Sequence, residues 1–186
     1  KMYAKLFWKD QKRKGYTLYD AERLMWERNY FASMMVKNGD ADAMLSGYSR
    51  NYRSVVKPIL ETISKAKGVG KVAATNLMLT KSGPLFLSDT TINVEPTSKE
   101  LSKIAQMTGH MAGLFGIEPI IALLSFSNFG SSRFSQAKKV SEAVSILHRS
   151  NPNLVVDGPI QSDFALNKDL LHKVFPFSVL NNKKVN

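Results

Sequence analysis

A stretch rich in hydroxyl, amide and glycine residues, 125–132, has the composition of a phosphate-binding loop. A continuous apolar run precedes it and apolar residues at helical spacing follow it, so we expect it to connect a strand to a helix. Free backbone N–H groups at the start of a helix attract anions, and small polar residues let a phosphate approach them. The stretch is either such a binding loop or a polar turn in which a serine caps the helix. Its candidate ligand residues are Ser127, Asn128, Gly130 and Ser131, with Arg133 directly after them.

Basic and hydrogen-bonding residues also gather directly after a short apolar run at 43–45, which we predict to be a brief strand. Charged donors near the end of a strand can bind an anion through charge-assisted hydrogen bonds. The same residues also fit the solvated face of a helix, and composition leaves both interpretations open. The candidates in this segment are Ser46, Arg50, Asn51, Tyr52 and Lys57.

Three other groups of residues favour structural roles over chemistry. Residues 89–93 follow a predicted strand and fit Asx and threonine turns. Residues 67–71 contain two glycines among lysines but lack the spacing and the ending of a Walker A loop, so we interpret them as a flexible turn. The three histidines are widely spaced, which disfavours a metal site. No Ser-His-Asp arrangement and no pair of carboxylates stands out.

The composition narrows the class of protein. The absence of cysteine excludes disulfides, thiol catalysis and zinc–thiolate sites, and it favours the cytoplasm as the location. The formal net charge is +11, from 26 Lys and Arg against 15 Asp and Glu. This charge indicates either a polyanionic partner or the basic half of a longer chain. We expect no nucleic acid and no membrane as partner, because signature motifs and apolar runs of membrane-spanning length are missing.

Hydrophobic periodicity predicts helices and short strands in alternation, which is typical of an α/β fold with helices on both faces of a sheet. Capping boxes at Thr17 and Thr97 mark two helix starts. The apolar run 120–124 fits a strand buried on both faces. Ligands of such sheets bind at the carboxyl ends of the strands, which selects the loops 46–57, 88–98 and 125–134. The predicted helices cover about residues 18–37, 52–63, 98–115, 137–147 and 168–174, and the other predicted strands 72–79, 85–87 and 154–156.

Short runs along nearly the whole chain carry a resemblance to a known family. They are residues 13–17, 31–36, 39–47, 89–93, 115–119, 124–127 and 156–158, with Gln161 and Asp163. These runs resemble the phosphate acetyl/butyryl transferase family. Residues 49–52, 127–131 and 175–178 are most similar to the C-terminal, transacetylase-like domain of multidomain bacterial NADP-dependent malic enzymes.

This resemblance implies a three-layer α/β/α fold related to that of isocitrate dehydrogenase, incomplete at both ends. It places residues 1–70 in a first lobe and residues 71–186 in a second lobe with a dimer interface. It also implies a cleft for acetyl-CoA, homodimers or higher homo-oligomers, and a regulatory role in the decarboxylation of malate to pyruvate. NADP, malate and a divalent metal would bind a separate N-terminal region of the parent chain. The alternative is a phosphate acetyltransferase, which transfers acetyl between CoA and phosphate.

Four positions depart from the pattern of active transacetylases. Those enzymes carry a Ser-Thr pair where Asn51 and Tyr52 stand, and arginines where Lys57 and Gln11 stand. Lysine keeps the charge of arginine but loses its bidentate fork, and glutamine loses the charge as well. The Ser-Arg pair near the C-terminus of the family's active site has no counterpart in this chain. We therefore expect no catalytic residue here and no transacetylase activity, with the residues named above binding an anion or an acyl-CoA.

Overall fold

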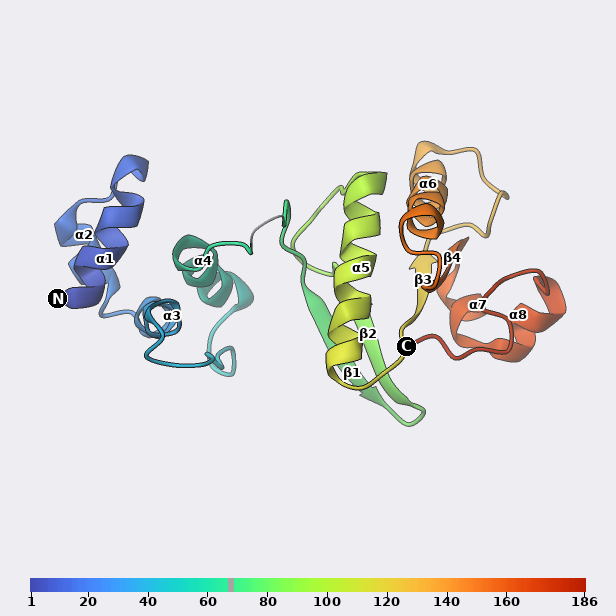
Figure 1. Ribbon diagram of the computed structural model, residues 1–186, viewed down its shortest axis with the longest axis horizontal. Helices are drawn as coiled ribbons and strands as arrows, with labels where there is room; N and C mark the ends of the chain where they lie inside the picture. The colour runs from blue at the N-terminus through green and yellow to red at the C-terminus, as the bar shows by residue number, and fades with distance from the viewer. Residues whose placement is uncertain (67–68) are drawn as a thin grey trace. The chain divides into compact units, whose positions relative to one another are not determined.

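A computed structural model describes residues 1–66 and 69–186 (Figure 1). The chain divides into two compact units, Lys1–Gly70 and Lys71–Asn186, which we term the N-terminal unit and the C-terminal unit. Lys67 and Gly68, part of the predicted turn at 67–71, lie outside the described residues. The assignment of the units to two lobes of the family's domain stays a prediction. No helix in the described part of the chain is long and apolar enough to cross a membrane.

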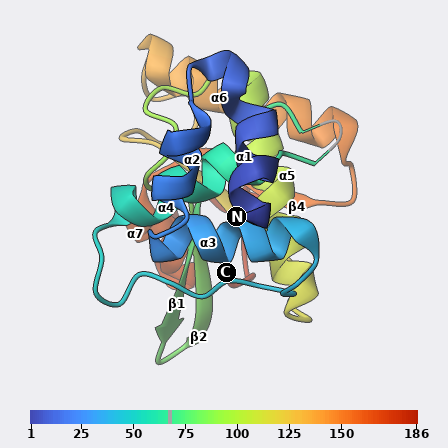
Figure 2. The same ribbon diagram turned by 90° about the vertical axis from the view of Figure 1, so that its left-hand side faces the viewer.

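In the described part of the N-terminal unit, all regular structure is helical. Its α-helices are α1 (Met2–Gln11), α2 (Leu18–Leu24), α3 (Arg28–Asn38) and α4 (Tyr52–Thr62), with a short 3-10 helix η1 (Lys12–Lys14). Helix α1 packs against α2 and α3, and α4 packs against α3 (Figures 1 and 2). Their common core consists of Ala4, Phe7, Ala21, Tyr30 and Met34.

The helix predicted over 18–37 is broken into α2 and α3 at Glu27. The predicted capping box starts α2, because Thr17 and Asp20 exchange both of its hydrogen bonds. The carboxylate of Glu27 then accepts from the backbone N–H groups of Asn29, at 2.9 Å, and Tyr30, at 3.1 Å. A side chain that satisfies free N–H groups starts a new helix, which an unbroken apolar pattern does not reveal.

The brief strand predicted at 43–45 is wrong. These residues have no regular structure, and Leu45 is fully exposed. Gly39 ends α3 with a φ of 80°, and the chain then crosses the surface to Asn51. A three-residue apolar run makes a strand only where another strand pairs with it, and the described residues of this unit contain no strand.

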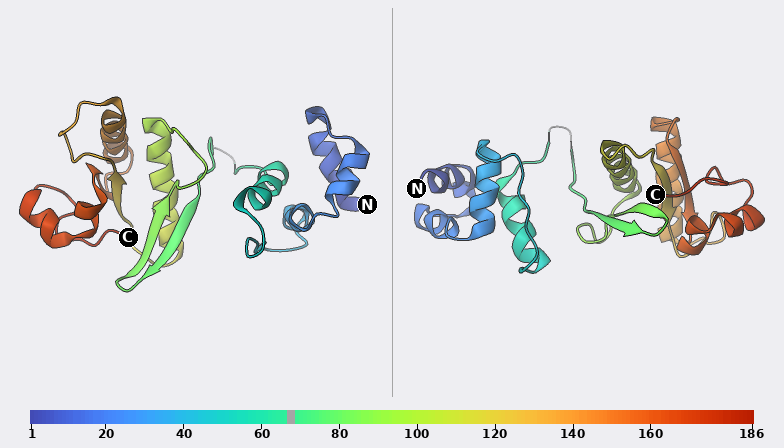
Figure 3. Two further views of the ribbon diagram at one scale, coloured as in Figure 1. Left: turned by 180° about the vertical axis from the view of Figure 1, so that it is seen from behind. Right: turned by 90° about the horizontal axis from the view of Figure 1, so that it is seen from below.

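The C-terminal unit combines two pairs of strands with four helices. Strands β1 (Thr75–Thr80) and β2 (Gly83–Ser88) form an antiparallel hairpin, and β3 (Ile120–Leu124) and β4 (Val155–Ile160) form a parallel pair. The helices are α5 (Ser98–Leu114), α6 (Ser135–Ser150), α7 (Ser162–Leu166) and α8 (Lys168–Val174). Helix α6 connects β3 to β4, as a parallel pair requires. Helix α5 packs on both β2 and β3 (Figures 1 and 3).

Helices cover both faces of the β3–β4 pair, as an α/β fold predicts. Alternate residues of a strand point to opposite faces. On one face Leu123 and Val156 pack with residues of α5 and α6, among them Ala105 and Val140. On the other face Ile120, Ala122 and Val155 pack with Ala165 of α7 and Leu171 of α8. The strands form two separate sheets, where the sequence predicted a single sheet. Helix α7 has no counterpart among the predicted helices.

Strand β4 continues to Ile160, past the end predicted at residue 156, and Gly158 makes this continuation possible. Gly158 has a φ of 144°, which L side chains rarely adopt, and a Cβ atom there would overlap the backbone oxygen of Leu123. The register between the strands shifts at this point, between the pairs Ala122↔Asp157 and Leu124↔Ile160. The close approach brings the end of β4 to the loop that follows β3.

Candidate functional site

The candidate residues fall into two groups, one in each unit. The first group surrounds the start of α4 in the N-terminal unit and consists of Ser46, Arg50, Asn51, Tyr52 and Lys57. The second group lies in the loop between β3 and α6 of the C-terminal unit and consists of Ser127, Asn128, Gly130, Ser131 and Arg133.

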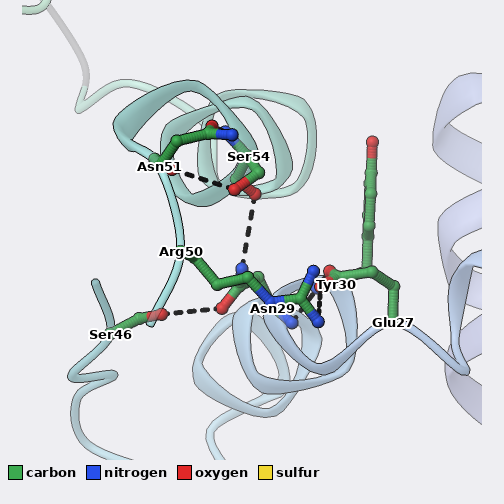
Figure 4. Close-up of polar contacts among 7 residues, drawn as sticks. All are labelled: Glu27, Asn29, Tyr30, Ser46, Arg50, Asn51 and Ser54. Carbon is green, nitrogen blue, oxygen red and sulfur yellow. Dashed lines mark hydrogen bonds and ion pairs between the residues drawn. The ribbon is translucent and has the colours of Figure 1, made fainter. Parts of the chain in front are cut away.

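Asn29, which is not among the predicted residues, contacts the first group (Figure 4). Its side chain is buried, with 5% of its surface exposed. The hydroxyl of Ser46 donates to Asn29 Oδ1 at 2.8 Å, and Asn29 Nδ2 donates to the backbone oxygen of Ser54 at 3.3 Å. Asn29 thus joins the loop at residue 46 to the first turn of α4. Sequence reasoning missed it, because its partners are distant in the chain and leave no local pattern.

Asn51 caps α4 and so uses its side-chain oxygen within the protein. Its Oδ1 accepts from the backbone N–H of Ser54 at 2.9 Å, and the Ser54 hydroxyl donates to the Asn51 backbone oxygen at the same distance (Figure 4). An asparagine at this position satisfies a free N–H group at the helix start. Tyr52, the first residue of the helix, is half exposed.

A cavity of about 190 Å³ lies between the start of α3 and the loop that leads to α4. Its polar lining comes from Arg28, Asn29, Ser46, Ser49 and Arg50. The Arg50 guanidinium lies 3.9 Å from Glu27 Oε1 (Figure 4). Two arginines therefore line the cavity, one of them near a carboxylate that already caps α3, and this arrangement suits an anion. Arg28 was not among the predicted residues, because the helix break that positions it was not predicted.

Lys57 does not line this cavity. Its Nζ lies 3.8 Å from Glu61 Oε1, one turn further along α4. The other carboxylate oxygen of Glu61 accepts from the hydroxyl groups of Tyr30 and, at 3.2 Å, Tyr16. Burial, together with the hydrogen bond to Glu61, raises the pKa of Tyr30 far above its usual value, so Tyr30 remains a donor. Gln11 is buried beside them and donates to the Glu61 backbone oxygen at 2.5 Å. We term these five residues the Glu61 cluster.

The second group forms a loop that is tied to the end of β4. Asn128 Nδ2 donates to Gln161 Oε1 at 2.6 Å, and Asn128 Oδ1 accepts from the backbone N–H of Gln161 at 2.7 Å. The Ser131 hydroxyl accepts from the Asn128 backbone N–H at 3.1 Å. Ser127 is buried, and its hydroxyl has no hydrogen-bond partner among the described residues.

Three members of the second group, Gly130, Ser131 and Arg133, remain exposed at the start of α6. The N-cap of that helix is Phe134, which provides no capping side chain. The serine cap that sequence reasoning allowed at this helix is therefore not formed. Its free N–H groups and Arg133 are the donors that this loop offers to an anion.

Comparisons with known proteins agree with this fold. A family model described as phosphate acetyl/butaryl transferase matches residues 1–184. The chain belongs to this family. It is 34% identical over 178 residues to the phosphate acetyltransferase of Nitratidesulfovibrio vulgaris, covering 96% of this chain and 25% of that protein. It is 38% identical over 170 residues to the NADP-dependent malic enzyme of Haemophilus influenzae, covering 91% of this chain and 22% of that protein.

A solved structure of the family has the same fold as this chain. A phosphotransacetylase from Streptococcus pyogenes superposes with a TM-score of 0.84 at 34% identity, covering 99% of this chain and 57% of that one. The expected α/β phosphotransacetylase fold is thereby confirmed. The chain spans about a quarter of the two curated relatives and somewhat more than half of the solved structure. Its family includes both phosphate acetyltransferases and malic enzymes.

Proposed function

We propose that this phosphotransacetylase-like chain is an acyl-CoA-binding domain that regulates an NADP-dependent malic enzyme in the cytoplasm. The Glu61 cluster is the observation that favours a regulatory domain over an active phosphate acetyltransferase. At Gln11 and Lys57 the resemblance expects arginines that hold phosphate and CoA. Here Gln11 is buried against the Glu61 backbone and Lys57 lies beside the Glu61 carboxylate. The phosphate clamp is therefore lost, whereas the cavity between Arg28 and Arg50 remains.

An acyl-CoA suits that cavity through its phosphates. The ligand carries a diphosphate and a 3′-phosphate, and charge-assisted hydrogen bonds to such groups contribute about 1.5–3 kcal/mol each when well placed. Arg28 and Arg50 supply two cations, and Ser46 and Ser49 add hydroxyl groups. Two or three such contacts, less the cost of association, correspond to binding at roughly micromolar to millimolar concentration.

Removal of either cavity arginine should weaken acetyl-CoA binding at least about tenfold, which corresponds to one lost contact of about 1.4 kcal/mol. The measurement is calorimetry with acetyl-CoA on the complete gene product, native and with Arg28→Ala or Arg50→Ala. Arg149→Ala is the matched control, because it removes the same charge from an exposed position on α6 in the other unit. Equal affinity in all four proteins would exclude the cavity as the site.

The regulatory role has its own readout in the same proteins. Acetyl-CoA should change the rate at which the complete protein forms NADPH from malate, and Arg50→Ala should need more acetyl-CoA for the same change. The NADP, malate and metal sites would lie in a separate N-terminal region. Within the described residues no group of three or more His, Asp or Glu side chains could hold a metal ion. If acetyl-CoA does not change the rate of NADPH formation, the regulatory role is contradicted, whereas the proposal that acetyl-CoA binds is not.

The alternative function is a phosphate acetyltransferase. The 34% identity to the Nitratidesulfovibrio vulgaris enzyme and to the Streptococcus pyogenes structure supports this alternative. Formation of acetyl phosphate from acetyl-CoA and phosphate distinguishes the two functions.

We also propose that the C-terminal unit carries a two-fold dimer interface. Leu114 and Phe115, at the end of α5, are 69% and 59% exposed, and Phe115 packs edge-on against Phe86 at 5.7 Å between ring centroids. A stable dimer buries more than the ~800 Å² below which most crystal contacts fall, and an exposed apolar helix end can contribute to such an area. Light scattering at micromolar concentration should give twice the subunit mass. Phe115→Lys should shift the protein toward monomer, and a native protein that is monomeric would contradict the interface.

A further inference from the structure

A cavity of about 170 Å³ in the C-terminal unit lies where three distant segments of the chain meet. They are the turn of the β1–β2 hairpin, the end of α7 with the start of α8, and residues 183–185, which run beside the hairpin (Figures 1 and 3). Three lysines line the cavity: Lys168 from α8, and Lys183 and Lys184 from the last segment. Among the described residues, no Asp or Glu lines it. We term it the lysine cavity.

Lys184 lies against the hairpin turn at Gly83. A Cβ atom on Gly83 would come within 3.2 Å of Lys184 Nζ, so the ammonium group sits beside a residue that has no side chain. The Thr80 hydroxyl donates to the Gly83 oxygen at 2.6 Å and lies 3.0 Å from the Ser82 hydroxyl, so the polar groups of the turn are bonded to one another. The side chain of Lys184 forms no hydrogen bond and no ion pair within the described part of the chain. Its charge is therefore held beside the turn without a protein acceptor.

The other two lysines of the cavity are also unpaired. Neither Lys168 nor Lys183 forms an ion pair with a described residue. The wall between the lysines is apolar and consists of Pro84, Leu85, Ala165, Leu166 and Val185. Such a wall offers no acceptor, and its low polarity strengthens both the repulsion among the ammonium groups and their attraction to an anion. An anion in the cavity would therefore replace a repulsive arrangement of charges by an attractive one.

The charges and the volume of the lysine cavity favour linked phosphate groups. An ammonium group is a compact point charge, which suits phosphate, whereas a planar carboxylate is matched by the fork of an arginine. A single phosphate group carries a charge of about −1.5 to −2 at neutral pH, so two linked phosphates come closer to balancing three lysines. The cavity has the volume of about five or six water molecules at about 30 Å³ each, which accommodates a diphosphate but not an attached nucleoside.

We propose that the lysine cavity binds a diphosphate group, either as the free anion or as part of a larger molecule that extends into solvent. The site is separate from the loop between β3 and α6. Asn186, directly after the cavity segment, donates its backbone N–H to Ile120 at the start of β3, whereas that loop begins after Leu124 at the other end. The cavity of Arg28 and Arg50 belongs to the other unit. The inference is therefore independent of acyl-CoA binding.

Lysine labelling of the complete gene product tests the proposal. An amine-reactive reagent modifies neutral amines that it can reach, and a bound anion both covers the ammonium groups and keeps them charged. Mass spectrometry gives the labelling rate of each lysine with and without inorganic diphosphate. The three cavity lysines should react at least about tenfold more slowly when diphosphate saturates the site. Lys173, on the same helix as Lys168 but outside the cavity, should react at an unchanged rate. Unchanged rates at all three cavity lysines would overturn the proposal.

Substitution of Lys184 tests whether the lysines bind one ligand together. Lys184→Ala should remove most of the protection of Lys168, whereas Lys184→Arg should retain it, because arginine keeps the charge. Lys173→Ala is the matched control and should leave the protection unchanged. If Lys168 stays fully protected in Lys184→Ala, the lysines do not share a ligand and the proposal is wrong. Among the described residues, no lysine lines the cavity of Arg28 and Arg50, so a negative result here does not contradict acyl-CoA binding.

Comparison of anions identifies the ligand. Sodium chloride at the same ionic strength should slow the labelling less than about twofold, and slowing equal to that by diphosphate would show screening alone and contradict the site. Inorganic phosphate should need at least about tenfold higher concentration than diphosphate for the same protection, and equal concentrations would contradict the linked pair. A nucleoside diphosphate that protects at lower concentration than inorganic diphosphate would assign the group to a larger molecule, and the opposite order would assign it to the free anion.

Discussion

Acetyl phosphate should not form when the complete protein is mixed with acetyl-CoA and inorganic phosphate. Transfer between the two requires several charged donors around the phosphate and the developing oxyanion, and loss of one such donor lowers the rate on the order of 10²–10³-fold. Gln11 is neutral and buried, and Lys57 lies beside Glu61. The side-chain oxygen of Asn51 caps the start of α4 by accepting from the Ser54 backbone N–H. The combined loss should place turnover well below the roughly 1–10³ s⁻¹ typical of enzymes.

The assay needs a positive and a negative control. A family member named as a phosphotransacetylase, such as that of Streptococcus pyogenes, shows that the assay detects transfer. Arg28→Ala removes a cavity cation and should leave the background unchanged, since there is no transfer to lose. Turnover in the usual range for enzymes, reduced by this substitution, would establish the acetyltransferase and exclude the inactive domain.

Gly158→Ala should destabilise the C-terminal unit by about 3–5 kcal/mol. Its φ of 144° is unfavourable for alanine, and the added Cβ would overlap the Leu123 backbone oxygen. The atoms that it would contact are the backbone and Cβ atoms of Leu123, which are not the flexible end of a side chain, so β3 and β4 must separate locally. A loss of this size lowers the unfolding temperature by on the order of 10 °C for a chain of this length. Calorimetric unfolding of the two proteins measures it.

Gly113→Ala is the matched control for this substitution. Gly113 lies in α5, and nothing lies within 4 Å of the position of an added Cβ. Alanine in a helix is favoured over glycine by about 0.8–1 kcal/mol, so this variant should be as stable as the native protein or slightly more stable. A Gly158→Ala protein as stable as Gly113→Ala would contradict the close approach of β3 and β4.

Elements with local signals could be predicted from the sequence. Helix α5 is bounded by the capping box of Thr97 and Glu100 and ends just before Gly116, and both signals lie within a few residues of its ends. Strand β3 could be predicted in the same way, because its five residues form a continuous apolar run, which is the signal of a buried strand. The family fold was predicted from several short runs along nearly the whole chain, because no single helix or strand identifies the family.

Features that depend on distant residues could not be predicted in this way. Asn29 acquires its role from Ser46 and Ser54, which are 17 and 25 positions away. Arg28 lines the cavity only because Glu27 starts a new helix within a continuous apolar pattern. The expected strand at 43–45 had the right composition but no strand to pair with. Local propensity is overridden wherever the deciding contact is tertiary.

The division into two units also separates the chromophores of the chain. Trp8 and Trp26 both lie in the N-terminal unit, and so does every tyrosine, at positions 3, 16, 19, 30, 48 and 52. The C-terminal unit contains phenylalanine as its sole aromatic residue type. Within these 186 residues, tryptophan emission and near-ultraviolet absorbance above the phenylalanine bands therefore follow one unit alone. A fluorescence titration would observe the unit that contains the Arg28 and Arg50 cavity, and the melting of Gly158→Ala would be nearly silent to it.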